Sequence, residues 1–366
     1  MITKNLWQKT IFYTKKTYSN NARDKMFTKI NEIMTAEEVK QLIPVPANLA
    51  ALKAKRDQEV KDIISGKDDR KLIIVGPCSA DNEEAVCDYI SRLATLAEKV
   101  KDKLMIVPRI YTNKPRTKGE GYKGILHNPD PHNTKTDIQA GIVALRHMHL
   151  RAISESGLSA ADEMLYPENY SYLDDLLSYV AVGARSSENQ QHRLVASGVD
   201  VPVGIKNPMH GSMSITLNGI YAAQIPNEFK YGNFQVKTEG NKYAHAILRG
   251  SVDVYGNNEP NYHYEDVMNF AALYAKQELA NPAVIIDTNH SNSNKQPFEQ
   301  VRIVHEVVNN MRYSPKMKEL VKGFLIESYI EDGNQKPGEN IYGKSITDGC
   351  LGWKKTEKLL LEVAEF

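Results

Sequence analysis

The sequence predicts an α/β protein whose main part is a (β/α)8 TIM barrel. From Lys71 onward, short apolar or β-branched runs alternate with longer amphipathic segments, which is typical of parallel strands joined by helices. Eight such runs occur, and eight is the number of strands in this barrel. The length of 366 residues also fits one barrel of about 250 residues with an extension.

The expected strands are short and are separated by helical patterns. Strands are predicted at 72–75, 104–107, 160–165, 179–182, 201–205, 244–248, 283–286 and 323–326. Helices are predicted at 83–99, 137–156 and 297–310, where apolar residues recur with the helical period. We also expect an inserted hairpin before the sixth strand.

Residues 1–66 are expected to form an N-terminal extension, and residues 67–366 the catalytic barrel. Residues 1–23 contain five basic residues and no acidic one. This pattern fits either a structural or regulatory arm or an organelle-targeting segment, although targeting segments favour Arg over Lys. A helical pattern covers 24–66 and is interrupted at Pro44 and Pro46. Its first part is marked by apolar residues at helical spacing, Ile30, Ile33 and Met34.

The composition excludes several classes of protein. Apolar residues make up 41% and charged residues 25%, the profile of a soluble globular chain. No stretch approaches the roughly 18 apolar residues of a membrane span, so no membrane partner is expected. Lys and Arg number 46 against 45 for Asp and Glu, which does not favour a nucleic-acid partner. Three cysteines without a CxxC pair indicate a reducing compartment, and we expect a cytoplasmic protein.

Charged or metal-binding side chains follow seven of the eight expected strands. Because the carboxyl ends of barrel strands open onto one mouth, these side chains are expected to meet there. The cationic members are Arg109, Lys114, Arg116, Arg185, Lys206 and Arg249. Arg binds phosphate and carboxylate groups through a planar fork, and Lys through a point charge. Six cations exceed the need of one phosphate and fit a pair of substrates that carry phosphates and a carboxylate.

A second group of residues is suited to a metal ion. Its members are Cys78, His290, Glu327 and Asp348. One thiolate, one imidazole and two carboxylates suit a divalent transition metal (Mn, Fe, Co or Zn) better than Ca or Mg. The four residues come from separate parts of the chain, so their spacing forms no motif. Taken singly, a residue such as Cys78 is more often a buried small hydrophobe, and one such as His290 is more often a hydrogen-bonded loop histidine.

Two other patterns are not assigned to a site. Residues 119–124 match GxGxxG but neither directly follow a strand nor open a helix, so we interpret them as a loop over the mouth. His147 and His149 lie two residues apart on an expected helix, and therefore face different sides.

Longer motifs occur in an order that resembles one enzyme family. They are Gly-Pro-Cys-Ser-Ala-Asp (76–81), Pro-Arg-Ile-Tyr-Thr-Asn-Lys-Pro-Arg-Thr (108–117), Gly-Ala-Arg-Ser-Ser-Glu (183–188), Val-Gly-Ile-Lys-Asn (203–207), Ile-Leu-Arg-Gly (247–250), Asp-Thr-Asn-His-Ser-Asn (287–292), Glu-Ser (327–328) and Ser-Ile-Thr-Asp-Gly-Cys (345–350). Over about residues 27–366 the chain resembles the type I 3-deoxy-D-arabino-heptulosonate-7-phosphate (DAHP) synthases, the feedback-regulated microbial kind. It departs from the family pattern at 186–187 and 208–210, where no residue assigned to chemistry is replaced.

The resemblance implies condensation of phosphoenolpyruvate with erythrose 4-phosphate and water, the first step of the shikimate pathway. The implied ligands of a divalent metal are Cys78, His290, Glu327 and Asp348. The implied phosphoenolpyruvate contacts are Arg109, Lys114, Arg185, Lys206 and Arg249. The phosphate of erythrose 4-phosphate would lie at Arg116 and Thr117. Lys114 is the candidate proton donor beside the developing alkoxide.

The resemblance also implies feedback inhibition by an aromatic amino acid. In the family the N-terminal extension crosses a subunit interface and closes over an effector pocket at the outer helices. The corresponding candidates here are Met164, Glu168 and Asp200. No motif distinguishes Phe, Tyr and Trp as effector, and the assembly would be a homodimer or a homotetramer.

Two other functions are compatible with parts of this pattern. A Schiff-base aldolase would use Lys206 on a barrel strand and would need no metal. A sensor of aromatic amino acids would keep the barrel and lack turnover. The presence of every expected ligand and cation argues against the sensor.

Overall fold

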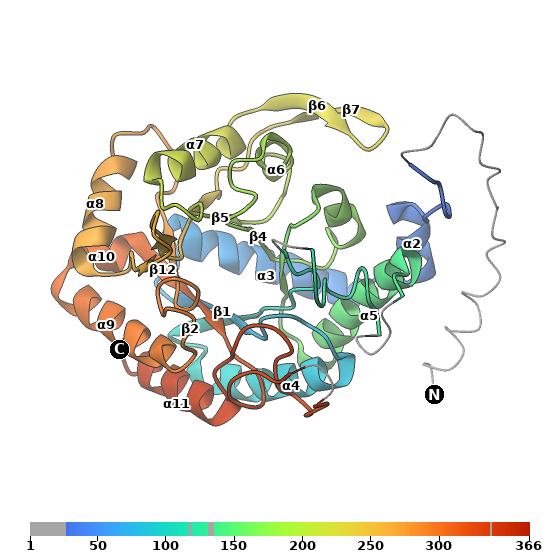
Figure 1. Cartoon of the computed structure of the whole chain (residues 1–366). Coiled ribbons are helices and arrows are strands. Elements are labelled where there is room, and N and C mark those ends of the chain that lie inside the picture. The colour runs from blue at the N-terminus through green and yellow to red at the C-terminus, as the bar shows by residue number, and fades with distance from the viewer. Residues whose placement is uncertain (1–26, 117–118, 131–134, 337–338) are drawn as a thin grey trace.

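The computed structural model describes residues 27–116, 119–130, 135–336 and 339–366. Eight parallel strands form one sheet in the spatial order β2-β1-β12-β11-β8-β5-β4-β3. The end strands β2 and β3 are linked by a parallel bridge between Arg109 and Ala161, so the sheet closes on itself. The predicted (β/α)8 barrel is confirmed, and Figure 1 looks into its mouth.

The barrel strands lie close to the predicted runs. They are β1 (Lys71–Gly76), β2 (Leu104–Pro108), β3 (Ala161–Glu163), β4 (Tyr179–Val182), β5 (Val203–Lys206), β8 (His245–Leu248), β11 (Val284–Asp287) and β12 (Val321–Glu327). Every residue of these strands is buried, because helices cover the outer face and the packed interior covers the inner face. This burial on both faces explains why the strands appear in the sequence as continuous apolar runs.

Helices surround the barrel on its outer side. They are α4 (Glu83–Val100), α5 (Ile138–Ser156), α6 (Gln190–Ala196), α7 (Met213–Gln224), α8 (Tyr264–Tyr274), α9 (Glu299–Tyr313), α10 (Pro315–Leu320) and α11 (Trp353–Ala364), with a short 3-10 helix η2 (Pro167–Tyr172) after β3. Side-chain caps fix several starts: Asn82 and Asp137 accept the amides of Ala85 and Ala140, each at 3.0 Å. The three predicted helices are confirmed as α4, α5 and α9.

The insertion before the sixth barrel strand is an antiparallel hairpin. Its strands, β6 (Asn227–Tyr231) and β7 (Phe234–Thr238), project from the rim between β5 and β8, as predicted (Figure 1). Gly232 at the turn has φ +56°, a conformation that glycine adopts without strain. A smaller hairpin, β9 (Ser251–Val252) and β10 (Asn258–Glu259), follows β8 and was not predicted.

In the described chain from residue 27 onward, two helices precede the barrel, α2 (Ala36–Leu42) and α3 (Ala47–Ser65). The predicted second helix is confirmed as α3, but the helix predicted around Ile30, Ile33 and Met34 is wrong, because residues 27–35 are not helical. The reason is local: Thr35 and Glu38 form a capping box that starts α2 after these residues. Ile30 is 78% exposed, so its apolar spacing has no packing surface that would favour a helix.

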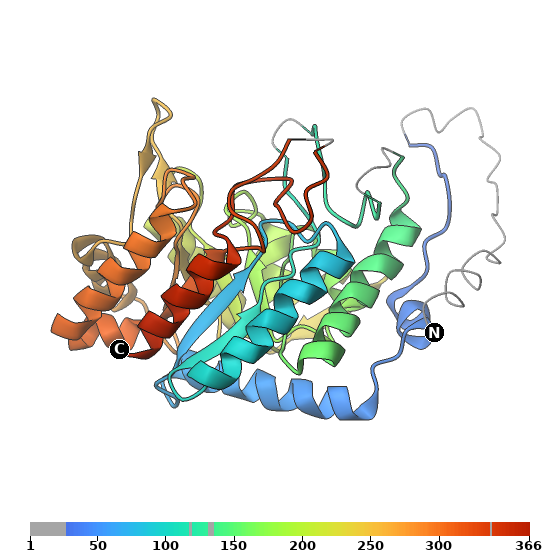
Figure 2. The same ribbon diagram turned by 90° about the horizontal axis from the view of Figure 1, so that it is seen from below.

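Helix α3 closes the end of the barrel opposite the mouth. Figure 2 shows it lying across the base of the barrel. Its side chains Val60, Ile63 and Ile64 are fully buried among the inward-facing residues of β1 and β2, such as Leu72 and Met105. The inner core therefore extends from α3 upward, and the pocket lies at the open end. Among the described residues, none of the helices has both the length and the apolar composition required to cross a bilayer.

Candidate active site

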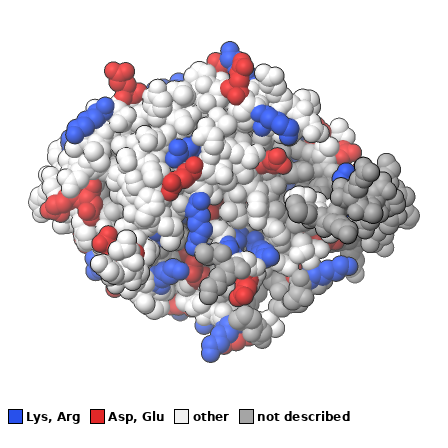
Figure 3. Space-filling view, turned by 45° about the horizontal axis from the view of Figure 1, so that its top comes forward, with Lys and Arg blue, Asp and Glu red and all other residues white. Residues whose placement is uncertain are grey.

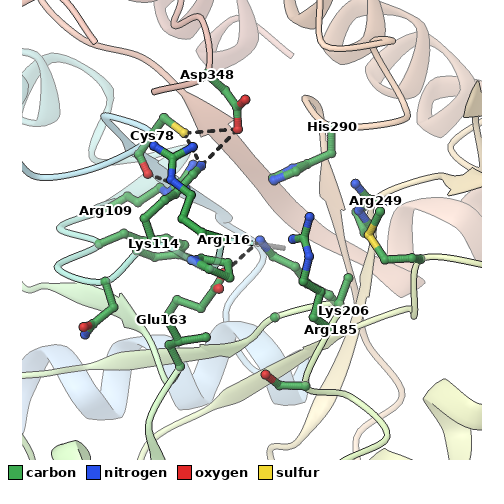
Figure 4. A pocket seen from close by; sticks show the side chains of 18 of the residues that line it. Cys78, Arg109, Lys114, Arg116, Glu163, Arg185, Lys206, Arg249, His290 and Asp348 are labelled. Carbon is green, nitrogen blue, oxygen red and sulfur yellow. Dashed lines mark hydrogen bonds and ion pairs between the residues drawn. The ribbon is translucent and has the colours of Figure 1, made fainter. Parts of the chain in front are cut away.

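A pocket at the carboxyl ends of the barrel strands collects the predicted cations. Figure 4 shows their side chains converging from several strands, and Figure 3 shows lysine and arginine atoms gathered on this face with carboxylates among them. The predicted residues that line it are Cys78, Arg109, Lys114, Arg116, Arg185, Lys206, Arg249, His290 and Asp348. Their expected meeting at one mouth is confirmed. Glu327 lies buried next to them, and Thr117 lies outside the described residues.

The parallel sheet explains this convergence. Lys206 is the last residue of β5, and Arg109 and Arg249 directly follow β2 and β8. Because all strands point the same way, their ends deliver these side chains to the same opening. Arg116 comes from the loop after β2, where its Nε donates to the backbone oxygen of Tyr122 at 2.9 Å.

Arg109 and Glu327 form a buried ion pair with an Nη1–Oε1 distance of 2.7 Å. Both side chains are at most 2% exposed. The second carboxylate oxygen of Glu327 accepts a hydrogen bond from Asn289 Nδ2 at 2.5 Å. Burial disfavours the Glu327 carboxylate, but the charges of Arg109 and His290 outweigh this effect and lower its pKa to about 2. The arginine is further packed on the Tyr111 ring, 3.9 Å from the ring centroid.

Lys206 lies between two buried carboxylates. Its Nζ is 3.3 Å from Glu163 Oε2 and 3.6 Å from Asp287 Oδ2. Burial alone would raise the pKa values of both acids, but nearby cations lower them, Lys206 first for Glu163 and His290 first for Asp287. Asp287 also lies 2.9 Å from His290 Nδ1. These two acids hold the cationic side chains in place before any anion arrives.

A donor cluster suitable for a metal ion borders the same pocket. Ligand atoms of Cys78, Glu327 and Asp348 all lie within 4.8 Å of one another. His290 Nε2 lies 3.8 Å from Glu327 Oε1, so the fourth predicted donor is adjacent. His290 is held there in the left-handed backbone region, with φ +51°. The set of sulfur, imidazole and carboxylate donors fits a divalent transition metal.

A lysine side chain lies against the donor cluster. Lys114 Nζ lies 2.7 Å from Cys78 Sγ and 3.0 Å from Asp348 Oδ2. Burial, with the Glu327 charge, raises the pKa of the Cys78 thiol to about 11. A divalent cation would offset this by pairing with the thiolate. The cluster therefore fits the metal that the sequence suggested, with Lys114 placed directly beside it.

Several lining residues were not found by sequence reasoning. They are Tyr111, Asn113, Glu163 and Lys295, and Asp287 and Asn289 lie just behind them. Glu163 and Asp287 end β3 and β11, so the rule that strand ends carry site residues could have found them. Tyr111 and Asn113 carry no charge, and no such signal marks them.

The candidate effector residues lie around η2, on the outer side of β3. Met164 lines a cavity with Tyr170 and Leu173, and Glu168 lines a neighbouring, more open one. The exposed Asp200 accepts the Tyr170 hydroxyl at 3.0 Å but is not among the described residues that line either cavity. The three candidates therefore lie in the same region of the surface but do not line one common pocket.

Comparisons with known proteins identify the family. A sequence model described as the DAHP synthetase I family matches residues 44–361. The chain belongs to this family. It is 38% identical over 352 residues to the Phe-sensitive phospho-2-dehydro-3-deoxyheptonate aldolase of Escherichia coli (strain K12), covering 91% of this chain and 97% of that protein. It is 36% identical over 343 residues to the Tyr-sensitive enzyme of the same strain, covering 90% and 92%.

A solved structure agrees with this assignment. The phospho-2-dehydro-3-deoxyheptonate aldolase of Francisella tularensis SCHU S4 superposes with a TM-score of 0.86 at 30% sequence identity. The match covers 93% of this chain and 98% of that one. The family model covers the barrel and the chain before it from residue 44 onward.

The buried pair of Arg109 and Glu327 gives a testable energetic prediction. In chelator-treated protein, Arg109→Met should lower the free energy of unfolding by about 3–5 kcal/mol, because Glu327 would remain buried without its partner. Urea unfolding measures this change. Arg302→Met is the control, since Arg302 is 52% exposed in its pairs with Glu299 and Glu306 and should cost less than about 1 kcal/mol. Equal small losses in both variants would show that the buried pair contributes little.

Proposed function

We propose that the chain is a metal-dependent phospho-2-dehydro-3-deoxyheptonate aldolase. It would join phosphoenolpyruvate, D-erythrose 4-phosphate and water to give DAHP and phosphate, the first step toward chorismate and the aromatic amino acids. The observation that carries this proposal is a pocket in which the six predicted cations and Lys295 meet a sulfur and carboxylate donor cluster, in a member of the DAHP synthetase I family. Two phosphorylated substrates need such a concentration of positive charge to approach each other.

The cations divide naturally between the two substrates. Those assigned to phosphoenolpyruvate are Arg109, Lys114, Arg185, Lys206 and Arg249. Paired acids hold Arg109, Lys114 and Lys206. Hydrogen bonds to Gly250 O and Ser291 Oγ hold Arg249. The phosphate and carboxylate of the substrate would therefore meet donors that are already oriented. Arg116 and Thr117, on the loop after β2, are assigned to the phosphate of erythrose 4-phosphate. Lys114 lies between the two groups and can contact both substrates.

The reaction requires charge stabilisation at two steps. The enol carbon C3 of phosphoenolpyruvate attacks the aldehyde carbon, and the aldehyde oxygen becomes negative. Lys114 Nζ would stabilise this oxygen and donate its proton. Water then adds to C2, and phosphate leaves by cleavage of the C–O bond. A metal held by Cys78, His290, Glu327 and Asp348 would supply a Lewis acid near the aldehyde oxygen.

The Schiff-base alternative is disfavoured by the surroundings of Lys206. Its Nζ is paired with Glu163 and lies near Asp287. Such a setting binds an ammonium, whereas a nucleophilic lysine is found in an apolar pocket or beside another cation. The metal-free aldolase therefore has less support than the metal-dependent condensation.

We also propose feedback inhibition by one aromatic amino acid at the outer region near η2. The curated relatives that resemble the chain include proteins named for Tyr, Phe and Trp sensitivity. Met164, Glu168 and Asp200 are the proposed contacts, and residues 1–66 are the proposed regulatory and oligomerisation arm. A homodimer or homotetramer in the cytoplasm completes this proposal.

The reaction and its metal can be tested together. Loss of phosphoenolpyruvate should require erythrose 4-phosphate and should stop after treatment with a chelator, with Mn, Co, Fe or Zn restoring turnover. Cys78→Ala should lose most of the activity and retain the melting temperature of the chelated protein, because it removes a ligand and little volume. Full turnover at trace metal levels would contradict metal dependence. A borohydride-trapped adduct with substrate would favour the Schiff-base alternative.

Arg185 tests the assignment of the cations. Arg185 is exposed in the free protein and would be covered by the bound substrate. Arg185→Ala should weaken binding of phosphoenolpyruvate by about 30-fold or more, because loss of one partner of a charge pair that the substrate buries costs roughly 2–5 kcal/mol. Apparent affinity from steady-state kinetics measures the change. Arg302→Ala, on the exposed face of α9, should leave that affinity unaltered. An unchanged affinity in Arg185→Ala would place this residue outside the phosphoenolpyruvate site.

The regulatory proposal is tested by truncation. Phe, Tyr and Trp are titrated separately against the full chain and against a chain lacking residues 1–35, which retains α2 and α3. One amino acid should inhibit the full chain, while the truncated chain should keep its turnover and lose inhibition, as expected for a coupling free energy of about 1–3 kcal/mol. Equal inhibition of both chains would remove the arm from the mechanism. No inhibition of the full chain would refute regulation.

A further inference from the structure

The junction between β2 and β3 is strengthened by one buried side chain, Asp162. The two strands share the bridge between Arg109 and Ala161, where Ile110 N donates to Ala161 O at 2.8 Å. Beyond that bridge, the Asp162 carboxylate makes the contact between the two segments. It is 4% exposed and accepts hydrogen bonds from Thr112 N at 3.0 Å and from Thr112 Oγ1 at 2.5 Å.

Thr112 begins the segment that carries part of the candidate site. It is fully buried, and its hydroxyl also accepts a hydrogen bond from Asn113 Nδ2 at 3.3 Å. Lys114 is two residues further along, with its Nζ at the donor cluster. Two bonds from one carboxylate, one to the backbone and one to the side chain of Thr112, fix both position and orientation at the start of this segment.

We propose that Asp162 is a positioning residue that, through Thr112, holds the 112–116 segment and thereby the erythrose 4-phosphate half of the site. This inference rests on the proposed function. Asp162 also accepts the amide of Glu163 at 2.7 Å, so the same carboxylate is anchored to its own strand. The contact thus connects the end of β3 with the loop after β2, across the junction at which the sheet closes.

A buried histidine lies near the Asp162 oxygen that accepts the Thr112 hydroxyl. His149 on α5 is fully buried, and its Nδ1 lies 2.8 Å from the carbonyl oxygen of Leu145, so Nδ1 carries the hydrogen. Its Nε2 is then an acceptor and lies 3.8 Å from Asp162 Oδ2, without a hydrogen-bond partner in the described part of the chain. A proton on Oδ2 of Asp162, the oxygen that also accepts the Thr112 hydroxyl, would have this acceptor nearby.

The charge state of this pair changes near neutral pH. Burial raises the pKa of Asp162 to about 7, with Glu163 adding to the rise and the Thr112 donors opposing it. Burial lowers the pKa of His149 to about 4, and the Arg146 charge adds to that shift. His149 is therefore neutral at pH 7, and the pair gains its proton on Asp162 as the pH falls.

The direction of the pH effect follows from the two Thr112 groups that donate hydrogen bonds to Asp162. Above pH 7 the ionised Asp162 accepts from both groups of Thr112. Below pH 7 the protonated oxygen turns its hydrogen toward His149 Nε2, which weakens the contact with the Thr112 hydroxyl. The contact is therefore stronger at pH 8 than at pH 6, where about nine-tenths of Asp162 would be protonated.

Thr112→Val is the test, because it removes the hydroxyl and keeps the shape. At pH 8 we expect kcat/KM for erythrose 4-phosphate to fall about tenfold, as for a small misplacement of reacting groups. The KM for phosphoenolpyruvate should change less than the KM for erythrose 4-phosphate, since only Lys114 among its assigned contacts lies in the 112–116 segment, whereas Arg185, Lys206 and Arg249 come from other strands. Thr112→Ser restores the hydroxyl and should recover most of the loss. Ser178→Ala, which removes a buried hydroxyl without a hydrogen-bond partner in the described residues, is the matched control.

The pH dependence separates positioning from general damage. The ratio of wild type to Thr112→Val should shrink from about tenfold at pH 8 to about threefold or less at pH 6, because the wild-type contact is itself weakened there. Using a ratio cancels the titration of the substrate phosphate. Asp162→Asn, which keeps the shape and cannot ionise, should likewise lose more activity at pH 8 than at pH 6.

Each result decides the inference. Wild-type kinetics in Thr112→Val, an equal loss for both substrates, or a ratio that does not change with pH would each overturn it. Melting temperatures identify a folding defect, and Thr112→Ser then provides the comparison. An inactive wild-type protein with metal present would instead overturn the proposed function, and this inference with it.

Discussion

The candidate site depends on the pairing of charges that are buried at the ends of the barrel strands. An arginine or lysine removed from water is costly unless a carboxylate or other hydrogen-bond acceptors compensate it. Arg109 has Glu327, and Lys206 has Glu163 with Asp287 nearby. These carboxylates hold the cationic side chains in fixed positions. A substrate anion therefore meets donors whose conformational entropy has already been lost.

The sequence predicted the barrel well because its strands are buried on both faces. Each strand is then a compact apolar run, and the run of Tyr179–Val182 has the bounds of β4. The helix around Ile30 failed because spacing alone says nothing of a packing surface, and the capping box at Thr35 decides where the chain becomes helical. Propensity and periodicity describe the local chain, whereas burial is decided by the whole molecule.

The pocket was predictable to the extent that its residues are charged and follow strands. Glu163 was missed because it lies inside the run predicted as a strand, and Asp287 because an acid directly after an apolar run looks like an ordinary loop residue. Only the spatial order β11-β8-β5-β4-β3 brings both to Lys206. The effector candidates are a different case, because Met164, Glu168 and Asp200 come from a resemblance and the geometry around η2 distributes them over separate surfaces.

The closure of the sheet between β2 and β3 gives the barrel a line of low cross-linking. Strands β2 and β3 are joined there by one bridge, between Arg109 and Ala161, whereas β1 and β12 are paired at five positions. Amide hydrogens along this line have fewer hydrogen bonds to break before they exchange with solvent, so we expect partial opening of the barrel to start here. A ligand held by Arg109 on one side and Lys206 on the other would bridge the line. Ligand binding at the mouth and the free energy of unfolding are thus thermodynamically linked, and the protein is most stable while its substrates are bound.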